Sequence, residues 1–212
     1  MIEVKEVSKR FGGAVALDRV SLSLEPGTVL GLVGHSGSGK TTLLRVIAGL
    51  LAPDSGAVAI DGVTVNDPSP LVPPRLRGVS MVFQSPALWP HMTVDENIRF
   101  TLEGLPRVEQ DRRIRRLLSA SGLNDLGARY PGQLSGGEAR RVSVLRALAP
   151  GKPYVLMDEP LVNMDPELKA EIHALIRAET AGRGVLYVTH DASELEGFAN
   201  TVLRLRGGMV EG

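Results

Sequence analysis

The first part of the chain alternates between apolar and polar residues in a way that predicts strands. Val20, Leu22 and Leu24 are separated by polar neighbours, the pattern of a half-buried antiparallel strand, and residues 2–7 predict a strand before it. The short apolar run at 29–33 is typical of a strand covered on both faces. A Gly-rich loop and a helical pattern follow this run, so these segments form the first half of a βαβ unit.

Alternating strand and helix patterns are also predicted on both sides of the segment between Gln84 and Ser135. The helix after the Gly-rich loop is expected to end at Gly49, a hairpin to cover 57–65 with its turn at Asp61-Gly62, and a strand to cover 79–83. From residue 154 the alternation resumes. It predicts a strand at 154–157, a helix from Pro166 to about Glu179, a strand at 185–188 and a last hairpin at Gly207-Gly208.

Between Gln84 and Ser135 the apolar spacing is helical. Thr93 with Glu96 three residues later forms a capping box, and a helix carrying Ile98, Leu102 and Leu105 is expected to follow it. Residues 114–123 predict a second helix. The chain is therefore expected to be one domain, residues 1–212, of α/β class, with an antiparallel β subdomain and a helical subdomain inserted at about 85–150.

Composition narrows the possible functions. The 212 residues carry 24 Lys and Arg against 24 Asp and Glu, which argues against a dedicated nucleic-acid binder because such affinity rests on excess positive charge. The chain has no Cys, so disulfides, thiolate metal sites and a cysteine nucleophile are excluded. Charged residues interrupt the first ten positions, and no segment reaches the ~18 apolar residues of a membrane span.

The loop at 34–41 has the sequence GHSGSGKT, which fits the P-loop pattern GxxxxGKT between a predicted strand and a predicted helix. Its glycines allow backbone N–H groups to converge on phosphate oxygens, Lys40 adds a full positive charge, and the Thr41 hydroxyl is a ligand for Mg²⁺. A flexible Gly/Ser turn that merely caps a helix would explain the glycines but not Lys40 and Thr41. The fold class is accordingly a P-loop NTPase core with a mainly parallel sheet.

A P-loop also needs a second strand that ends in a carboxylate to hold the metal ion. The apolar run at 154–157 is the candidate for this strand. Asp158 follows this run as the expected Mg²⁺ partner, and Glu159 is the expected general base that polarises the attacking water. An ordinary strand end with solvated charges is the alternative for these two acids alone. The P-loop upstream favours the catalytic interpretation.

The segment Leu134-Ser135-Gly136-Gly137-Glu138 resembles the signature of ATP-binding-cassette (ABC) proteins, whose usual form ends in Gln. Ser135 and Glu138 also form a capping box, and the two roles are compatible. The resemblance implies that Ser135 and the Gly amides face the γ-phosphate of an ATP held by another subunit's P-loop. It covers essentially the whole chain, with the motifs in family order.

The resemblance assigns four further positions. Phe11 matches an aromatic residue that stacks on adenine, with a core residue as the alternative; Gln84 matches the Q-loop, which reaches Mg²⁺ or the attacking water. Asp165, in the looser D-loop segment Leu161-Val162-Asn163-Met164-Asp165, matches the D-loop acid, and it is also a helix N-cap before Pro166. His190 matches the switch histidine that contacts the γ-phosphate.

Taken together, the resemblance implies three sets of functional residues: catalytic, Mg²⁺-binding and ATP-binding. The catalytic residues would be Glu159, His190, Gln84 and Lys40, and the Mg²⁺ ligands would be Thr41, Gln84 and Asp158. The residues that would bind ATP are Phe11, Gly34, His35, Ser36, Gly37, Ser38, Gly39, Lys40, Thr41, Thr42, Ser135, Gly136, Gly137 and Asp165. His35 occupies a variable P-loop position, and His91 and His173 are assigned no chemistry.

Residues 85–94 are similar to the segment after the Q-loop in ATPase subunits of bacterial solute importers. This implies an ATPase that powers import as a homodimer or paired subunit, peripheral to the cytoplasmic face of the membrane. Its partners would be transmembrane permease subunits and, indirectly, a solute-binding protein, with no nucleic acid. Trp89 lies either near the permease groove or packed as a loop anchor. No C-terminal regulatory β domain is expected after the final hairpin.

Two alternatives remain open and one is disfavoured. An exporter ATPase would differ mainly in its membrane partner. A soluble, non-transport ABC ATPase is the other alternative, although the segment between Gln84 and Ser135 leaves no room for a long coiled coil. A GTPase is disfavoured because no NKxD follows the P-loop; Asn163-Met164-Asp165 lacks the Lys.

Overall fold

The computed structural model describes residues 1–66, 72–162 and 164–211. The chain divides into two compact units. The first unit comprises Met1–Met81, Lys152–Glu159 and Gly182–Gly212, and the second comprises Val82–Gly151 and Pro160–Ala181. Each unit is described in turn.

A six-stranded sheet forms the centre of the first unit, in the order β10-β9-β3-β8-β7-β6. Strands β9, β3, β8 and β7 pair in parallel, and β10 pairs antiparallel with β9. All residues of β7 and β8 are buried, as expected for a parallel strand covered on both faces. The strands are β3 (Val29–Val33), β6 (Val79–Val82), β7 (Tyr154–Asp158), β8 (Gly184–Thr189), β9 (Thr201–Arg206) and β10 (Met209–Glu211).

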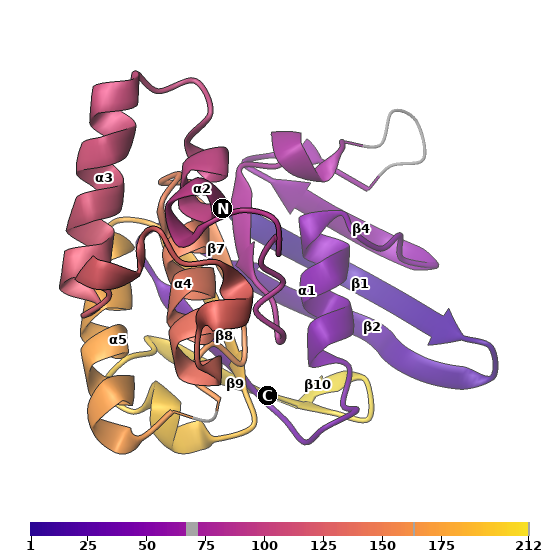
Figure 1. Cartoon of the computed structure of the whole chain (residues 1–212). Helices are drawn as coiled ribbons and strands as arrows, with labels where there is room; N and C mark the ends of the chain where they lie inside the picture. Colours follow the sequence, from indigo (N-terminus) through magenta and orange to yellow (C-terminus); the bar gives the residue numbers. More distant parts are fainter. Residues whose placement is uncertain (67–71, 163, 212) are drawn as a thin grey trace. The chain divides into compact units, whose positions relative to one another are not determined.

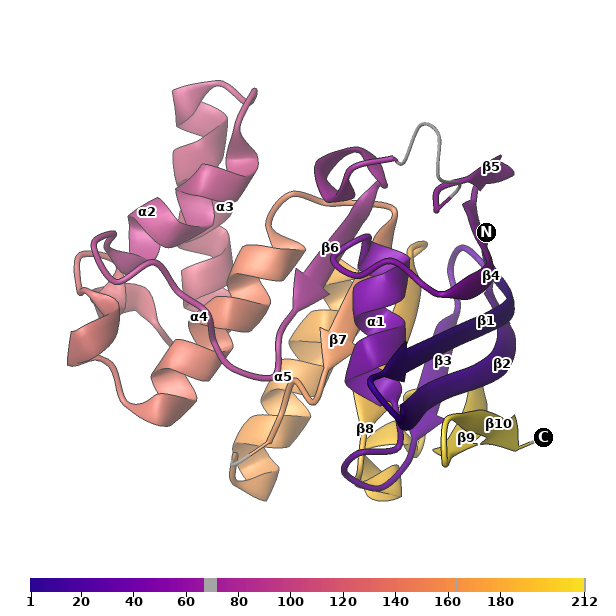
Figure 2. The same cartoon turned by 90° about the vertical axis from the view of Figure 1, so that its right-hand side faces the viewer.

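An antiparallel sheet of order β2-β1-β4-β5 completes this unit. Ile2 pairs with Leu24 and Val4 with Leu22, so the predicted alternation places these apolar side chains on one buried face. Helix α1 contacts both β2 and β7, and Figures 1 and 2 show it beside this sheet. The elements are β1 (Ile2–Phe11), β2 (Ala14–Leu24), β4 (Ser55–Ile60), β5 (Val63–Thr64), α1 (Lys40–Ala48) and the 3-10 turns Pro74–Leu76 and Ala192–Leu195.

A buried arginine holds the C-terminal end of α1. The Arg77 guanidinium, 3% exposed, donates to the carbonyl oxygens of Val46 (3.2 Å), Ile47 (3.0 Å) and Val65 (2.8 Å). Gly49 is the predicted C-cap, with φ of 79°, and a Cβ there would lie 2.5 Å from Arg77 Cζ. The helix that begins at the P-loop is therefore fixed at its opposite end by a long-range contact.

The second unit is helical. Helix α2 packs on α3 and α4, and α4 packs on α5. The predicted capping boxes at Thr93 and Ser135 and the predicted N-cap at Asp165 are all present. The elements are α2 (Val94–Arg99), α3 (Arg107–Ala120), α4 (Gly136–Leu148), α5 (Pro166–Glu179) and the 3-10 turns Phe100–Leu102, Asn124–Leu126 and Pro131–Gln133.

Two details differ from the expectation. The helix expected to carry Ile98, Leu102 and Leu105 ends at Arg99 and continues only as a 3-10 turn. Leu105 lies half-exposed in a loop because Gly104, with φ of 92°, and Pro106 stop the helix. Helix α5 also belongs to the helical unit rather than to the α/β core.

Arginines of α3 bind the other helices of this unit. Arg113 and Arg116 make ion pairs of 2.8 and 2.9 Å with the buried carboxylate of Glu179 on α5. Arg113 also donates to the carbonyl oxygens of Leu148 and Ala149 at the C-terminal end of α4, each at 3.2 Å. One side chain thus satisfies carbonyls that the helix itself leaves unpaired.

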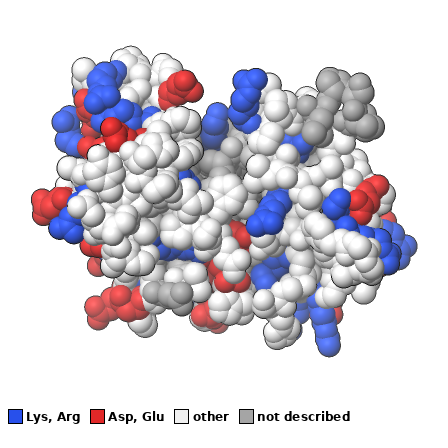
Figure 3. Space-filling model, turned by 45° about the vertical axis from the view of Figure 1, so that its right-hand side comes forward, with Lys and Arg blue, Asp and Glu red and all other residues white. Residues whose placement is uncertain are grey.

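The surface carries both signs of charge. In the face shown in Figure 3, blue and red side chains are scattered over a mainly uncharged surface, in keeping with the equal counts of acidic and basic residues. Within the described ranges, no helix combines the length and apolar character that crossing a bilayer requires.

Replacement of Arg77 tests the contact that anchors α1. We expect Arg77→Met to lower the free energy of unfolding in urea by about 2–3 kcal/mol, because several buried carbonyls would lose their donor. Arg75→Met, at an exposed site in the adjacent turn, should change it by less than about 0.5 kcal/mol. Equal effects of the two changes would show that Arg77 does not anchor the helix.

Candidate nucleotide site

The P-loop connects β3 to α1, as predicted, and two of its glycines have no space for a side chain. A Cβ on Gly34 would collide with the Leu205 carbonyl oxygen and lie 2.6 Å from Ser38 Oγ. Gly39, the N-cap of α1, has φ of 109°, and its Cβ would meet the Ala16 carbonyl oxygen. No side chain caps this helix, so its first N–H groups are available to an anion.

Lys40 lies folded over its own loop. Its side chain is 5% exposed, and Nζ donates to the carbonyl oxygens of Gly34 (2.6 Å) and His35 (2.9 Å). Burial lowers the pKa of Lys40, while the carboxylates of Glu159 and Asp158 oppose that shift. An ammonium at the uncapped start of α1 suits a phosphate chain, because both offer positive charge to an anion.

Asp158 ends β7 next to the start of α1. It is 1% exposed, and its Oδ1 accepts a hydrogen bond of 3.2 Å from Thr41 Oγ1. Burial raises the pKa of Asp158 and Glu159 adds to the shift, whereas the Thr41 bond opposes it. A buried carboxylate beside a hydroxyl is a pair of hard oxygen donors, so these two residues fit the Mg²⁺ that accompanies nucleotide phosphates.

Glu159 takes a backbone conformation that side chains rarely adopt. Its φ is 47°, and its N–H donates to the Val188 carbonyl oxygen at 2.8 Å. The left-handed turn brings Glu159 Oε2 to 3.2 Å from His190 Nδ1. Such strain costs on the order of 1 kcal/mol and is common at functional sites. A carboxylate oriented by an imidazole is a suitable general base.

A hollow of about 330 Å³ lies beside the P-loop, and its lining includes two histidines and two arginines. His35 and His190 are exposed there, and Arg204 and Arg206 come from the end of β9. Sequence reasoning did not select these arginines. Their spacing of two in a strand was a usable signal, because it places both side chains on one face.

Phe11 lies at the end of β1 and is 52% exposed, with Lys9 Nζ at 5.9 Å from its ring centroid. The core alternative for Phe11 is therefore wrong. Its role in stacking on adenine stays a prediction.

The remaining predicted residues belong to the helical unit. Ser135 Oγ accepts from the Glu138 N–H at 3.3 Å, and Glu138 Oε2 accepts from the Ser135 N–H at 2.7 Å. These bonds hold the pKa of Glu138 below its usual value, so the residue that departs from the signature is turned back to cap α4. Gly136 and Gly137 form the first turn of that helix.

Gln84 is exposed, two residues after the end of β6. Asp165 is the N-cap of α5, and its Oδ1 accepts from the Leu168 N–H at 2.9 Å. Asn163, in the predicted D-loop, lies outside the described residues. Predicted site residues thus fall into two groups. The first unit holds Phe11, the loop from Gly34 to Thr42, Asp158, Glu159 and His190; the second holds Gln84, the signature residues and Asp165.

The cap at Glu138 predicts a pH-dependent effect on stability. Because the pKa of Glu138 is depressed in the folded chain, its stabilisation is present above the unfolded pKa and is lost as the pH falls through the folded pKa. Glu138→Gln should lower Tm by about 1 °C at pH 7, and the difference should shrink as the pH falls through the depressed pKa of Glu138. A Tm difference that stays constant over this range in thermal melts would contradict the cap.

Known proteins resemble the chain over its whole length. A family model described as ABC transporter matches residues 17–162. The Fe(3+) ions import ATP-binding protein of Brucella melitensis biotype 1 is 42% identical over 99% of this chain and 59% of its own length. The probable sulfate/thiosulfate import ATP-binding protein of Chlorella vulgaris is 38% identical over 99% of this chain and 89% of its own.

A solved ATP-binding cassette, a dimer in a post-hydrolysis state bound to ADP and Pi, matches with a TM-score of 0.90 and 32% identity. The match covers 100% of this chain and 97% of that one, which confirms the predicted P-loop NTPase fold. This chain spans 59% of the length of the iron-import relative. Fold, motifs and family model agree: the chain belongs to the ATP-binding-cassette transporter family.

Proposed function

We propose that the chain binds and hydrolyses ATP as the energy-supplying subunit of a solute importer. The observation that carries this proposal is the arrangement at the edge of the parallel sheet. There the Thr41–Asp158 pair and the Glu159–His190 pair stand next to the buried ammonium of Lys40. A triphosphate, its metal ion and an attacking water each find a matching group among these residues.

The hydrolytic step follows from these positions. Lys40 and the N–H groups of the loop bind the β- and γ-phosphate oxygens, and Thr41 and Asp158 hold Mg²⁺, which neutralises phosphate charge when bound. Glu159 accepts a proton from the attacking water. His190 orients the Glu159 carboxylate and contacts the γ-phosphate. Gln84 takes the Q-loop role that the family resemblance implies, and Phe11 stacks on adenine.

Two copies, or this chain and a paired ATPase subunit, complete each site. The N–H groups at the start of α4, with Ser135, Gly136 and Gly137, face the γ-phosphate held by the P-loop of the partner. Asp165 lies at the same junction. The dimeric state of the solved cassette supports this arrangement.

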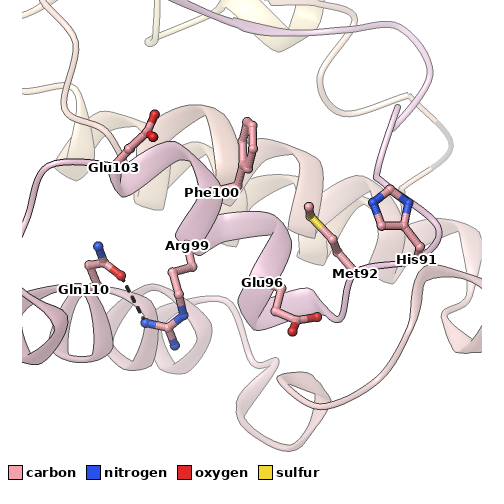
Figure 4. Close-up of a pocket in the computed structure, with 7 residues that line it drawn as sticks. All are labelled: His91, Met92, Glu96, Arg99, Phe100, Glu103 and Gln110. Carbon is pink, nitrogen blue, oxygen red and sulfur yellow. Dashed lines mark hydrogen bonds between the residues drawn. The ribbon is translucent and has the colours of Figure 1, made fainter.

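Import is the direction named for both relatives. One is an Fe(3+) ions import ATP-binding protein, and the other is a probable sulfate/thiosulfate import ATP-binding protein. In our proposal the chain works at the cytoplasmic face of the membrane with permease subunits, and only indirectly with a solute-binding protein. The helical unit has a hollow of about 510 Å³ on its surface. Met92 and Phe100 form its apolar part, and Figure 4 shows Arg99 turned toward Gln110.

Glu159→Gln tests the general base. We expect steady-state ATP turnover to fall by about 10² or more while ATP binding persists, because the amide cannot accept the proton from water. Glu167→Gln, at an exposed position of α5, should stay within about twofold of wild type. Turnover in Glu159→Gln close to the wild-type value would remove Glu159 from the mechanism.

Mixing two inactive variants tests the shared site. Lys40→Ala loses the P-loop charge. Gly137→Asp places a negative charge at the signature, where a Cβ meets nothing within 4 Å. Each variant alone should hydrolyse ATP at least about tenfold more slowly. An equimolar mixture contains mixed dimers with one intact site and should regain activity. No recovery at any mixing ratio would place both motifs in the same site of one chain.

A further inference from the structure

The segment 83–89 follows β6 in the helical unit and has no regular secondary structure. Backbone carbonyls outside helices and sheets need other donors when they are screened from water. Two buried arginines of α4 supply them. Arg140 Nη1 donates to the carbonyl oxygens of Phe83 (2.6 Å) and Gln84 (2.7 Å), and Arg146 donates to those of Ala87 (2.8 Å) and Pro86 (3.3 Å).

The far end of this segment is held as well. Trp89 exchanges hydrogen bonds with the buried side chain of Asn97, with its N–H donating at 2.9 Å and its carbonyl oxygen accepting at 3.2 Å. Its ring lies 4.9 Å from the Arg146 guanidinium and 4.5 Å from the Phe100 ring centroid. Trp89 therefore packs as a loop anchor, and its other expected role, beside the permease groove, stays a prediction.

Arg140 and Arg146 are only 3% and 8% exposed, so their bonds to the segment are made away from water. Hydrogen bonds from a charged donor are stronger than neutral ones, and a guanidinium offers two of them in a fixed geometry. Both arginines stand on the helix that Ser135 begins. The same rigid helix therefore carries the signature residues at its start and fixes the backbone of Gln84 from its side.

We propose that Arg140 is a positioning residue that couples the signature helix to Gln84, so that the two motifs move as one body during ATP hydrolysis. The inference rests on the proposed function and adds a residue to it. Arg140 is distinguished from Arg146 and Asn97 because it alone among these three bonds to the carbonyl of Gln84 itself. Loss of its guanidinium leaves the carbonyls of Phe83 and Gln84 without this donor and lets Gln84 drift from its position.

The test compares Arg140→Met with Arg113→Met in the chain of 212 residues. Arg113 is a matched control because its guanidinium also donates to two backbone carbonyls, those of Leu148 and Ala149 at the C-terminal end of α4. Two quantities are measured: amide hydrogen exchange of residues 84–89 without nucleotide, and steady-state kinetics with MgATP. Arg140→Lys, which keeps one charged donor, is the conservative variant. All assays run at a temperature where each variant is folded.

We expect Arg140→Met to speed exchange in 84–89 by about tenfold or more and to lower kcat by a similar factor, with KM within about twofold, since ATP binding is left intact. Arg140→Lys should recover part of kcat, and Arg113→Met should leave both quantities near wild type. Unchanged exchange in Arg140→Met, or an equal loss of kcat in Arg113→Met, would overturn the positioning role. Absence of turnover in the wild-type chain would instead refute the proposed function.

Discussion

The site depends on one constraint, which is the burial of a positive charge among backbone groups. Removing an ammonium from water is costly unless it gains partners. Among the described residues, Lys40 gains two carbonyl oxygens from its own loop, and the carboxylates of Asp158 and Glu159 are close enough to affect its pKa. The P-loop N–H groups need an anion for the same reason. A phosphate chain satisfies both requirements at once. The glycines at 34 and 39 let the loop take this path, because a Cβ at either position would collide with the carbonyl oxygen of Leu205 or Ala16.

The parallel sheet brings the P-loop, Asp158 and His190 to the same place. Leu30 pairs with Leu186, and Val185 pairs with Val155, so β3, β8 and β7 end at the same edge. The P-loop directly follows β3, His190 directly follows β8, and Asp158 is the last residue of β7. In open α/β sheets ligands bind at such edges, because parallel strands deliver residues far apart in sequence to one place. A shift of register in any of the three strands would separate the charges that define the site.

Local signals were sufficient to predict much of this structure. The capping boxes at Thr93 and Ser135 and the buried strands β7 and β8 follow from neighbouring residues, so short segments determine them. The shorter α2 was also readable from Gly104 and Pro106. The roles of Arg77 and Arg140 were not, because their partners lie far along the chain and only the folded structure reveals which carbonyls lack donors. The left-handed backbone at Glu159 likewise leaves no trace in composition or periodicity.

The central claim is that the charge of Lys40 holds a nucleoside triphosphate, and calorimetric titration of the chain with MgATP tests it most directly. We predict saturable binding by the wild-type chain and an affinity at least about 30-fold weaker for Lys40→Met, since loss of a buried charge contact costs roughly 2–5 kcal/mol. Equal affinities for the two proteins would contradict it, because the buried ammonium would then have no part in holding the phosphates.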